Sequence, residues 1–101
     1  SLDDQEIAEQ LAFDAVAEKL AVCAQGDVTP IVSVYWWEGE PKTAREYRIA
    51  FKCLPHQLDG LERWILDRHP YETPEWLVVA AERVGEKYLS WAEANSHTPP
   101  F

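Results

Sequence analysis

The chain has 101 residues, of which 18 are acidic and 9 basic, so its formal net charge is −9 at pH 7. This length supports one domain over residues 1–101, and a composition that is 47% hydrophobic is typical of a packed core. The acidic excess argues against binding of nucleic acid or anionic lipid, and no apolar run is long enough to span a membrane.

The first predicted helix covers about residues 5–21, with Asp3 and Glu6 as a plausible pair of caps at its start. Gly26 and Asp27 end the region. The apolar residues of this segment fall at helical spacing on one stripe: Ala8, Leu11, Ala12, Ala15 and Val16. Because this stripe is mostly alanine, we expect the helix to lie close against a sheet.

Two strands are predicted next. Residues 31–37 are β-branched and aromatic, which favours a strand covered on both faces, and residues 38–42 have the composition of a turn. From Arg45 to Cys53 apolar and charged residues alternate, as expected of a strand with one buried face. Together these segments predict an antiparallel hairpin.

The second half predicts a helix, a strand and a final helix. The helix runs from Pro55 to Arg68, because proline suits its first turn and Pro70 stops it. Residues 76–81 are expected to form a third strand, and a short helix follows Gly85. The tail, residues 96–101, is expected to be extended.

The predicted fold class is α+β. The order helix–strand–strand–helix–strand–helix equals a ferredoxin-like βαββαβ sandwich with its first strand missing and an extra C-terminal helix. We therefore expect the natural chain to have a strand before Ser1. A complete four-stranded sheet built from these 101 residues alone would contradict that expectation.

Cys23 and Cys53 are too few for a disulfide framework, so a reduced cytoplasmic protein is the simplest interpretation. The acidic first residues do not resemble a secretory signal, which begins with a basic region.

Two segments resemble signatures of the CutA divalent-cation tolerance family. These are Val34–Glu40, a strand and turn, and Arg68–Glu75, which matches the family's H-P-Y-x-x-P-E pattern. Three supporting matches follow in the family's order: Ala17–Ala24, Phe51–Lys52 and Tyr88–Trp91.

The resemblance implies a ferredoxin-like fold, a tight homotrimer, a first strand ahead of Ser1, and a role in tolerance of copper and other divalent metals. Five tryptophans in a chain of this size independently favour assembly into an oligomer, because their side chains add more apolar surface than a small monomer can easily bury.

His69 is the candidate metal ligand. The resemblance implies a copper site made in some relatives by two histidines before Pro-Tyr and a first-strand cysteine, but Arg68 replaces the first histidine here. One imidazole alone is a weak site. The alternative is that His69 caps the second helix. Cys53 and His56 have a ligand-like spacing, whereas the strand pattern favours a packed Cys53, and Cys23 is expected to pack similarly.

Five further residues lie on motifs that the resemblance places near clefts between subunits: Trp37, Glu38, Lys52, Tyr71 and Glu75. A lysine and acids beside aromatic walls could hold a small anion or a metal-bound ligand. The alternative is that they stabilise the subunit interface and the turn.

The sequence has no nucleotide, hydrolase or zinc-protease motif, so we expect no enzyme activity. The leading hypothesis is a CutA-like homotrimer that binds copper or another divalent metal weakly, with no firm cofactor. The alternative is a signalling or scaffold trimer of the PII type that binds a small ligand between subunits. A trimer whose cleft is empty also fits the sequence.

Overall fold

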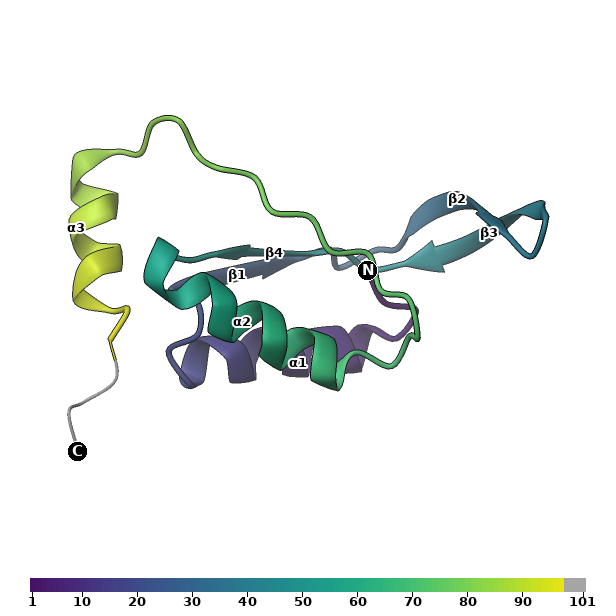
Figure 1. The fold of residues 1–101 in the computed structure, drawn as a ribbon, viewed down its shortest axis with the longest axis horizontal. Coiled ribbons are helices and arrows are strands. Elements are labelled where there is room, and N and C mark those ends of the chain that lie inside the picture. The colour runs from purple at the N-terminus through teal and green to yellow at the C-terminus, as the bar shows by residue number, and fades with distance from the viewer. Residues whose placement is uncertain (98–101) are drawn as a thin grey trace.

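The computed structural model describes residues 1–97 (Figure 1). In chain order its elements are α1 (Gln5–Ala17), β1 (Cys23–Gly26), β2 (Ile31–Trp37), β3 (Glu40–Glu46), β4 (Ile49–Lys52), α2 (Pro55–Arg68) and α3 (Glu86–Ala94). The bounds predicted for β2 and α2 are confirmed, and the final helix follows Gly85 as expected.

The strands form two antiparallel ribbons. β1 pairs with β4, from Cys23 opposite Lys52 to Gly26 opposite Ile49. β2 pairs with β3 over seven residues, up to the turn at Glu38 and Gly39, where both residues have positive φ. The β2–β3 ribbon, called the arm below, extends beyond the helices at one end of the molecule (Figure 1).

The two ribbons meet at an ion pair. The Asp27 carboxylate accepts from the Arg48 backbone N–H (3.0 Å) and from its Nε (2.9 Å), while Asp27 N–H donates to the Arg48 carbonyl. The prediction of a single strand from Arg45 to Cys53 is therefore wrong in one respect. The strand is interrupted at residues 47–48, where the chain passes from the arm to β4.

Helix α1 begins at Gln5, as predicted, but its N-cap is Asp4 rather than Asp3, and it ends four residues earlier than expected. Asp4 is the N-cap and accepts from the N–H groups of Glu6 and Ile7. At the other end, Lys19 adopts a left-handed backbone (φ 64°) and Leu20 N–H bonds the Ala15 carbonyl. This hydrogen-bonded turn is a Schellman motif, and it ends the helix at Ala17 rather than at residue 21.

Two strand predictions need correction. Residues 23–26, for which the sequence pattern predicts no strand, form β1 because their backbone pairs with β4. The strand predicted at residues 76–81 is extended but has no pairing partner among residues 1–97. It follows that the described residues contain no four-stranded sheet.

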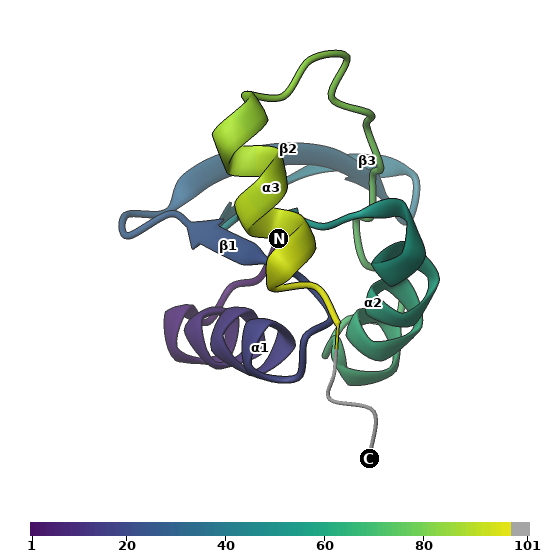
Figure 2. The same cartoon turned by 90° about the vertical axis from the view of Figure 1, so that its left-hand side faces the viewer.

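The two long helices lie side by side on one face of the β1–β4 ribbon, and α3 stands across its end (Figure 2). The buried stripe of α1 is Ala8, Leu11 and Ala15, as the alanine pattern predicts. Ala15 packs with Leu61 and Ile65 of α2 in one core cluster, and Trp64 contacts both this cluster and a second one around Leu2. The fold class is therefore α+β, as predicted.

The expectation that β2 is covered on both faces is wrong within one chain. Val32, Val34 and Trp36 point to one side of the arm and are 60%, 68% and 75% exposed.

No helix of the described part reaches the length and apolarity needed to cross a bilayer. Of the tail predicted to be extended, Ser96 is buried, and residues 98–101 lie outside the described residues.

Candidate functional site

His69 lies at the C-terminal end of α2, where both of its ring nitrogens contact backbone groups. Tyr71 N–H donates to Nδ1 (3.1 Å), and Nε2 lies 3.0 Å from the Ser1 carbonyl oxygen. Because Nδ1 accepts, Nε2 carries the proton and donates to Ser1. The imidazole thus joins the loop after α2 to the residues that precede α1.

The surroundings of His69 favour the neutral forms of its imidazole and of the Tyr71 phenol. Burial lowers the pKa of His69, and burial also raises the pKa of Tyr71 to about 12. The two rings meet edge to face at 4.9 Å. Arg68, where the resemblance implies a histidine, stacks its guanidinium over Trp64 at 4.4 Å.

The other sulfur and imidazole groups do not gather around His69. Cys53 packs against the core cluster of Ala15 and Leu61, and burial raises the pKa of its thiol. His56 contacts the Ser96 carbonyl through Nε2 (3.2 Å) and stacks on His97. Across residues 1–97 no three His, Cys, Asp or Glu side chains come together as a metal site would require.

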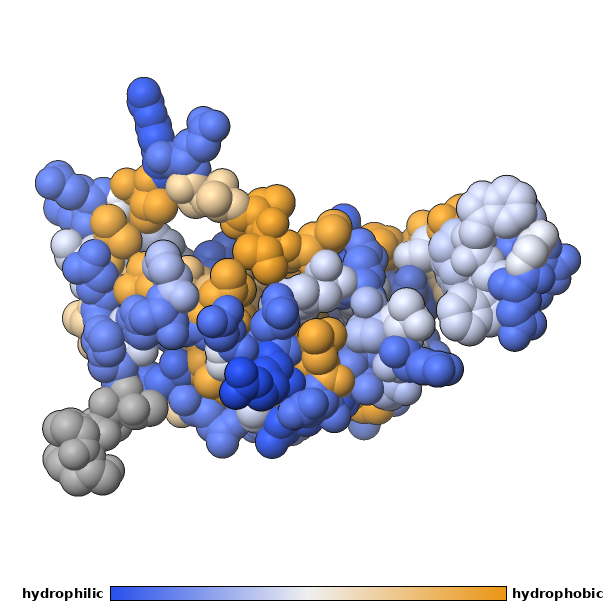
Figure 3. Space-filling model, viewed as in Figure 1, coloured by the Kyte–Doolittle hydropathy of each residue, from blue (hydrophilic) through white to orange (hydrophobic). Residues whose placement is uncertain are grey.

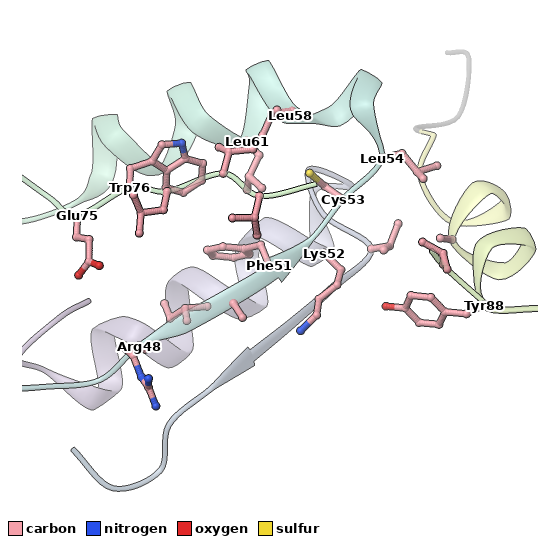
Figure 4. A pocket seen from close by; sticks show the side chains of 18 of the residues that line it. Arg48, Phe51, Lys52, Cys53, Leu54, Leu58, Leu61, Glu75, Trp76 and Tyr88 are labelled. Carbon is pink, nitrogen blue, oxygen red and sulfur yellow. The ribbon is translucent and has the colours of Figure 1, made fainter. Parts of the chain in front are cut away.

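An apolar groove of about 530 Å³ runs between β4 and the extended residues 76–79 (Figure 4). Phe51, Leu61 and Trp76 gather in its middle, and α3 contributes Tyr88 at one end. Trp76 is held there by its Nε1, which donates to Glu62 (2.6 Å).

The groove continues to the surface. In Figure 3 apolar residues gather over the stretch between the arm and α3, where Leu77 and Val79 are 79% and 90% exposed.

The five predicted cleft residues do not meet within one chain. Lys52 and Glu75 both line the groove; Lys52 Nζ bonds Gln25, and Glu75 accepts from Ser1 Oγ (3.3 Å). Trp37 and Glu38 lie at the tip of the arm, far from the groove, and Tyr71 packs on His69 instead. A cleft that contains all five residues therefore needs more than one copy of the chain.

The groove itself was not predicted from the sequence. Its walls include Val84 and the exposed residues 77–79, and the sequence pattern predicts for residues 77–79 only that they belong to a strand. The alternation of Tyr47, Ile49, Phe51 and Cys53 was the available signal, because it marks a strand with one apolar face.

A comparison with protein families matches residues 1–95 to the model described as CutA1 divalent ion tolerance protein. Among curated proteins, the chain is similar to the divalent-cation tolerance proteins CutA of Yersinia pestis and Yersinia pseudotuberculosis. Each is 36% identical over 93 residues, which cover 91% of this chain and 76% of the relative.

Solved structures give the same result for the fold. CutA from Synechococcus elongatus superposes with a TM-score of 0.89 at 34% identity, over 95% of this chain and 84% of that one. CutA1 from Oryza sativa has a TM-score of 0.89 at 32% identity, over 97% and 89% of the two chains. The helices and strands described above are therefore arranged as in these proteins.

Proposed function

This chain belongs to the CutA1 family of divalent-ion tolerance proteins, and on that basis we propose that it acts in tolerance of copper as a homotrimeric, weakly metal-binding protein. The observation that carries the proposal is the family match over residues 1–95, together with relatives whose names state divalent-cation tolerance. The proposed role is metal binding in the cytoplasm, without catalysis.

His69 is the proposed metal contact. Its Nε2 contacts the Ser1 carbonyl, which belongs to a short stretch ahead of α1. A metal ion could bind Nε2 only in the other neutral tautomer, in which the ring proton has moved to Nδ1, so both the Ser1 contact and the hydrogen bond from Tyr71 N–H to Nδ1 would be lost. Because one imidazole supplies one ligand, we expect binding to be weak and to fall steeply below the pKa of His69.

Assembly is the second part of the proposal. The arm presents Val32, Val34 and Trp36 on one exposed face and Tyr35 and Trp37 on the other. Aromatic and aliphatic side chains of this kind are enriched in interface cores. A two-stranded ribbon with such faces is also an aggregation hazard unless other subunits cover it.

The test is a calorimetric titration of the purified protein, first with copper and then separately with zinc. We expect saturable binding at one site per chain, lost in His69→Ala and retained in the matched control His56→Ala. Binding that is absent, or that His69→Ala leaves unchanged, contradicts the metal proposal. It would favour the PII-like alternative, in which Trp37, Glu38, Lys52, Tyr71 and Glu75 of neighbouring subunits hold a small ligand. Thermal-shift screening with nucleotides and small anions then tests that alternative.

A further inference from the structure

Helix α1 exposes a large aromatic side chain on the side that faces away from the core. Phe13 is 70% exposed, whereas Leu11 and Ala15 of the same helix are buried. Each of these two lies two residues from Phe13 along the chain, so Phe13 projects from roughly the opposite side of the helix. Since α1 lies on one face of the β1–β4 ribbon (Figure 2), Phe13 adds little to the core of its own chain.

The surroundings of Phe13 form a shallow hollow on the surface. Glu6, Glu9 and Gln10 line this hollow together with Phe13. Ala17 follows Phe13 by about one turn on the same exposed side, so a small side chain stands beside a large one. A side chain of a partner could pack on the Phe13 ring above Ala17, as an anchor residue does in a protein interface. This side of α1 therefore has an apolar centre with polar residues around it.

The charge around Phe13 is negative and is not neutralised within the chain. Residues 1–18 contain no lysine or arginine and six acidic residues: Asp3, Asp4, Glu6, Glu9, Asp14 and Glu18. Glu6 and Glu9 are exposed, and neither of the two ion pairs found within residues 1–97 includes a residue of α1. A partner that covers Phe13 must bring positive charge to these carboxylates, because a carboxylate that loses water without gaining a cation is destabilised.

The same charge argues against a second copy of the chain as the occupant. Two copies that met through α1 would bring acidic surfaces together, and each chain carries a net charge of −9. Nucleic acid and anionic lipid are disfavoured for the same reason. A cationic protein segment with an apolar side satisfies both the aromatic centre and the acidic surroundings.

We propose that the outer side of α1 is a docking surface for a basic amphipathic helix of a partner protein. Phe13 and Ala17 are four residues apart, and side chains at this spacing form the rows between which a second helix packs. The apolar side of the partner helix packs on Phe13 and Ala17, and its lysine or arginine side chains pair with Glu6 and Glu9. This interaction goes beyond the proposed function and does not depend on metal binding at His69.

The experiment uses a labelled peptide of about 15 residues made of leucine and lysine, with the leucines at helical spacing. Fluorescence anisotropy measures its Kd for the purified protein at low and at physiological salt. We expect Phe13→Ser, which removes the apolar anchor, to weaken binding about tenfold. The double variant Glu6→Gln with Glu9→Gln should weaken binding at low salt and reduce the dependence of Kd on salt.

Two controls separate this surface from a general attraction between a basic peptide and an acidic protein. Glu82→Gln with Glu93→Gln removes the same charge at exposed positions away from α1 and should leave Kd nearly unchanged. A peptide of the same composition in scrambled order should bind more weakly, because its leucines no longer share one side of a helix. Circular dichroism checks that each variant is folded.

Binding that is absent, or that Phe13→Ser leaves unchanged, would overturn the proposal. So would equal weakening by the Glu82 and Glu93 substitutions or equal binding of the scrambled peptide, since either would show attraction to the net charge alone. A Phe13→Ser variant that assembles to a smaller mass than the wild type would place a second copy on this surface and would also overturn the proposal.

Discussion

The His69 ring holds its position only as a neutral imidazole. Nδ1 accepts a hydrogen bond from Tyr71, and a doubly protonated ring has no acceptor. Burial lowers the pKa of His69 below 6.5, opposed by the Ser1 carbonyl and the carboxylate of Glu46, which raise it. The folded state thus binds a proton at His69 less readily than the unfolded state does.

The stabilisation supplied by His69 should be lost as the pH falls. Below pH 6.5 the unfolded ring takes up a proton while the folded ring resists, so the free energy of unfolding decreases. We expect His69→Gln to lower the stability by about 1–2 kcal/mol at pH 7.5, for two lost hydrogen bonds, and by less at pH 5. Urea unfolding followed by tryptophan fluorescence measures this difference. His56→Gln is the control for replacing a histidine elsewhere, and a difference that grows toward pH 5 would contradict the prediction.

The contact between His69 and Ser1 could not be predicted from the sequence, although His69 itself was. The motif around Pro70 marks His69 as a candidate functional residue. Its partner lies 68 positions away and uses a backbone carbonyl, which any residue type could supply. Sequence patterns of this kind locate a side chain on an element, but they do not identify the backbone group that it contacts.

At the scale of elements, the end of α1 depends on one residue in an unfavourable conformation. Lys19 has φ 64°, a left-handed backbone that costs most L-residues about 1–2 kcal/mol and costs glycine little. Gln57 of α2 donates to the Lys19 carbonyl (2.9 Å), which fixes the turn against the second helix. The conformation is therefore maintained by tertiary contacts rather than by local preference.

Replacing Lys19→Gly should stabilise the protein. Glycine adopts the left-handed conformation without strain, and the hydrogen bonds of the turn use backbone groups that it retains. We expect a gain of about 0.5–1 kcal/mol in the free energy of unfolding, measured by chemical denaturation. Glu18→Gly is the matched control: Glu18 has φ −87°, so this substitution should destabilise by a similar amount. A loss of stability in both variants would mean that Lys19 is not strained.

The elements that the sequence predicts well have local signals at both ends. α2 lies between Pro55 and Pro70, and β2 ends at the turn of Glu38 and Gly39. The errors are at places where a partner decides the outcome. The end of α1 lacks the glycine that usually marks it, β1 is a strand because β4 pairs with it, and residues 76–81 have a strand's composition without a paired neighbour.

At the scale of the whole molecule, the arm is the feature that one chain leaves incomplete. It extends beyond the core, and every second residue from Val32 to Trp36 is apolar and mostly exposed on one face (Figure 1). With a net charge of −9 the chains repel one another, so association must come from apolar contacts of this kind. The proposed homotrimer would place these side chains between subunits.

Trp36→Glu should therefore dissociate the assembly without unfolding the chain. Trp36 is 75% exposed in one subunit, so the substitution costs the monomer little, whereas a carboxylate buried at an interface costs several kcal/mol per subunit. By size-exclusion chromatography with light scattering, we expect the wild type at three times the 11.6 kDa of one chain and the variant at the mass of one chain. Phe13→Glu is the matched control, because Phe13 is 70% exposed on α1 and away from the arm, and its variant should stay trimeric. A monomeric wild type, or a Trp36→Glu variant that keeps the wild-type mass, would show that the arm does not hold subunits together.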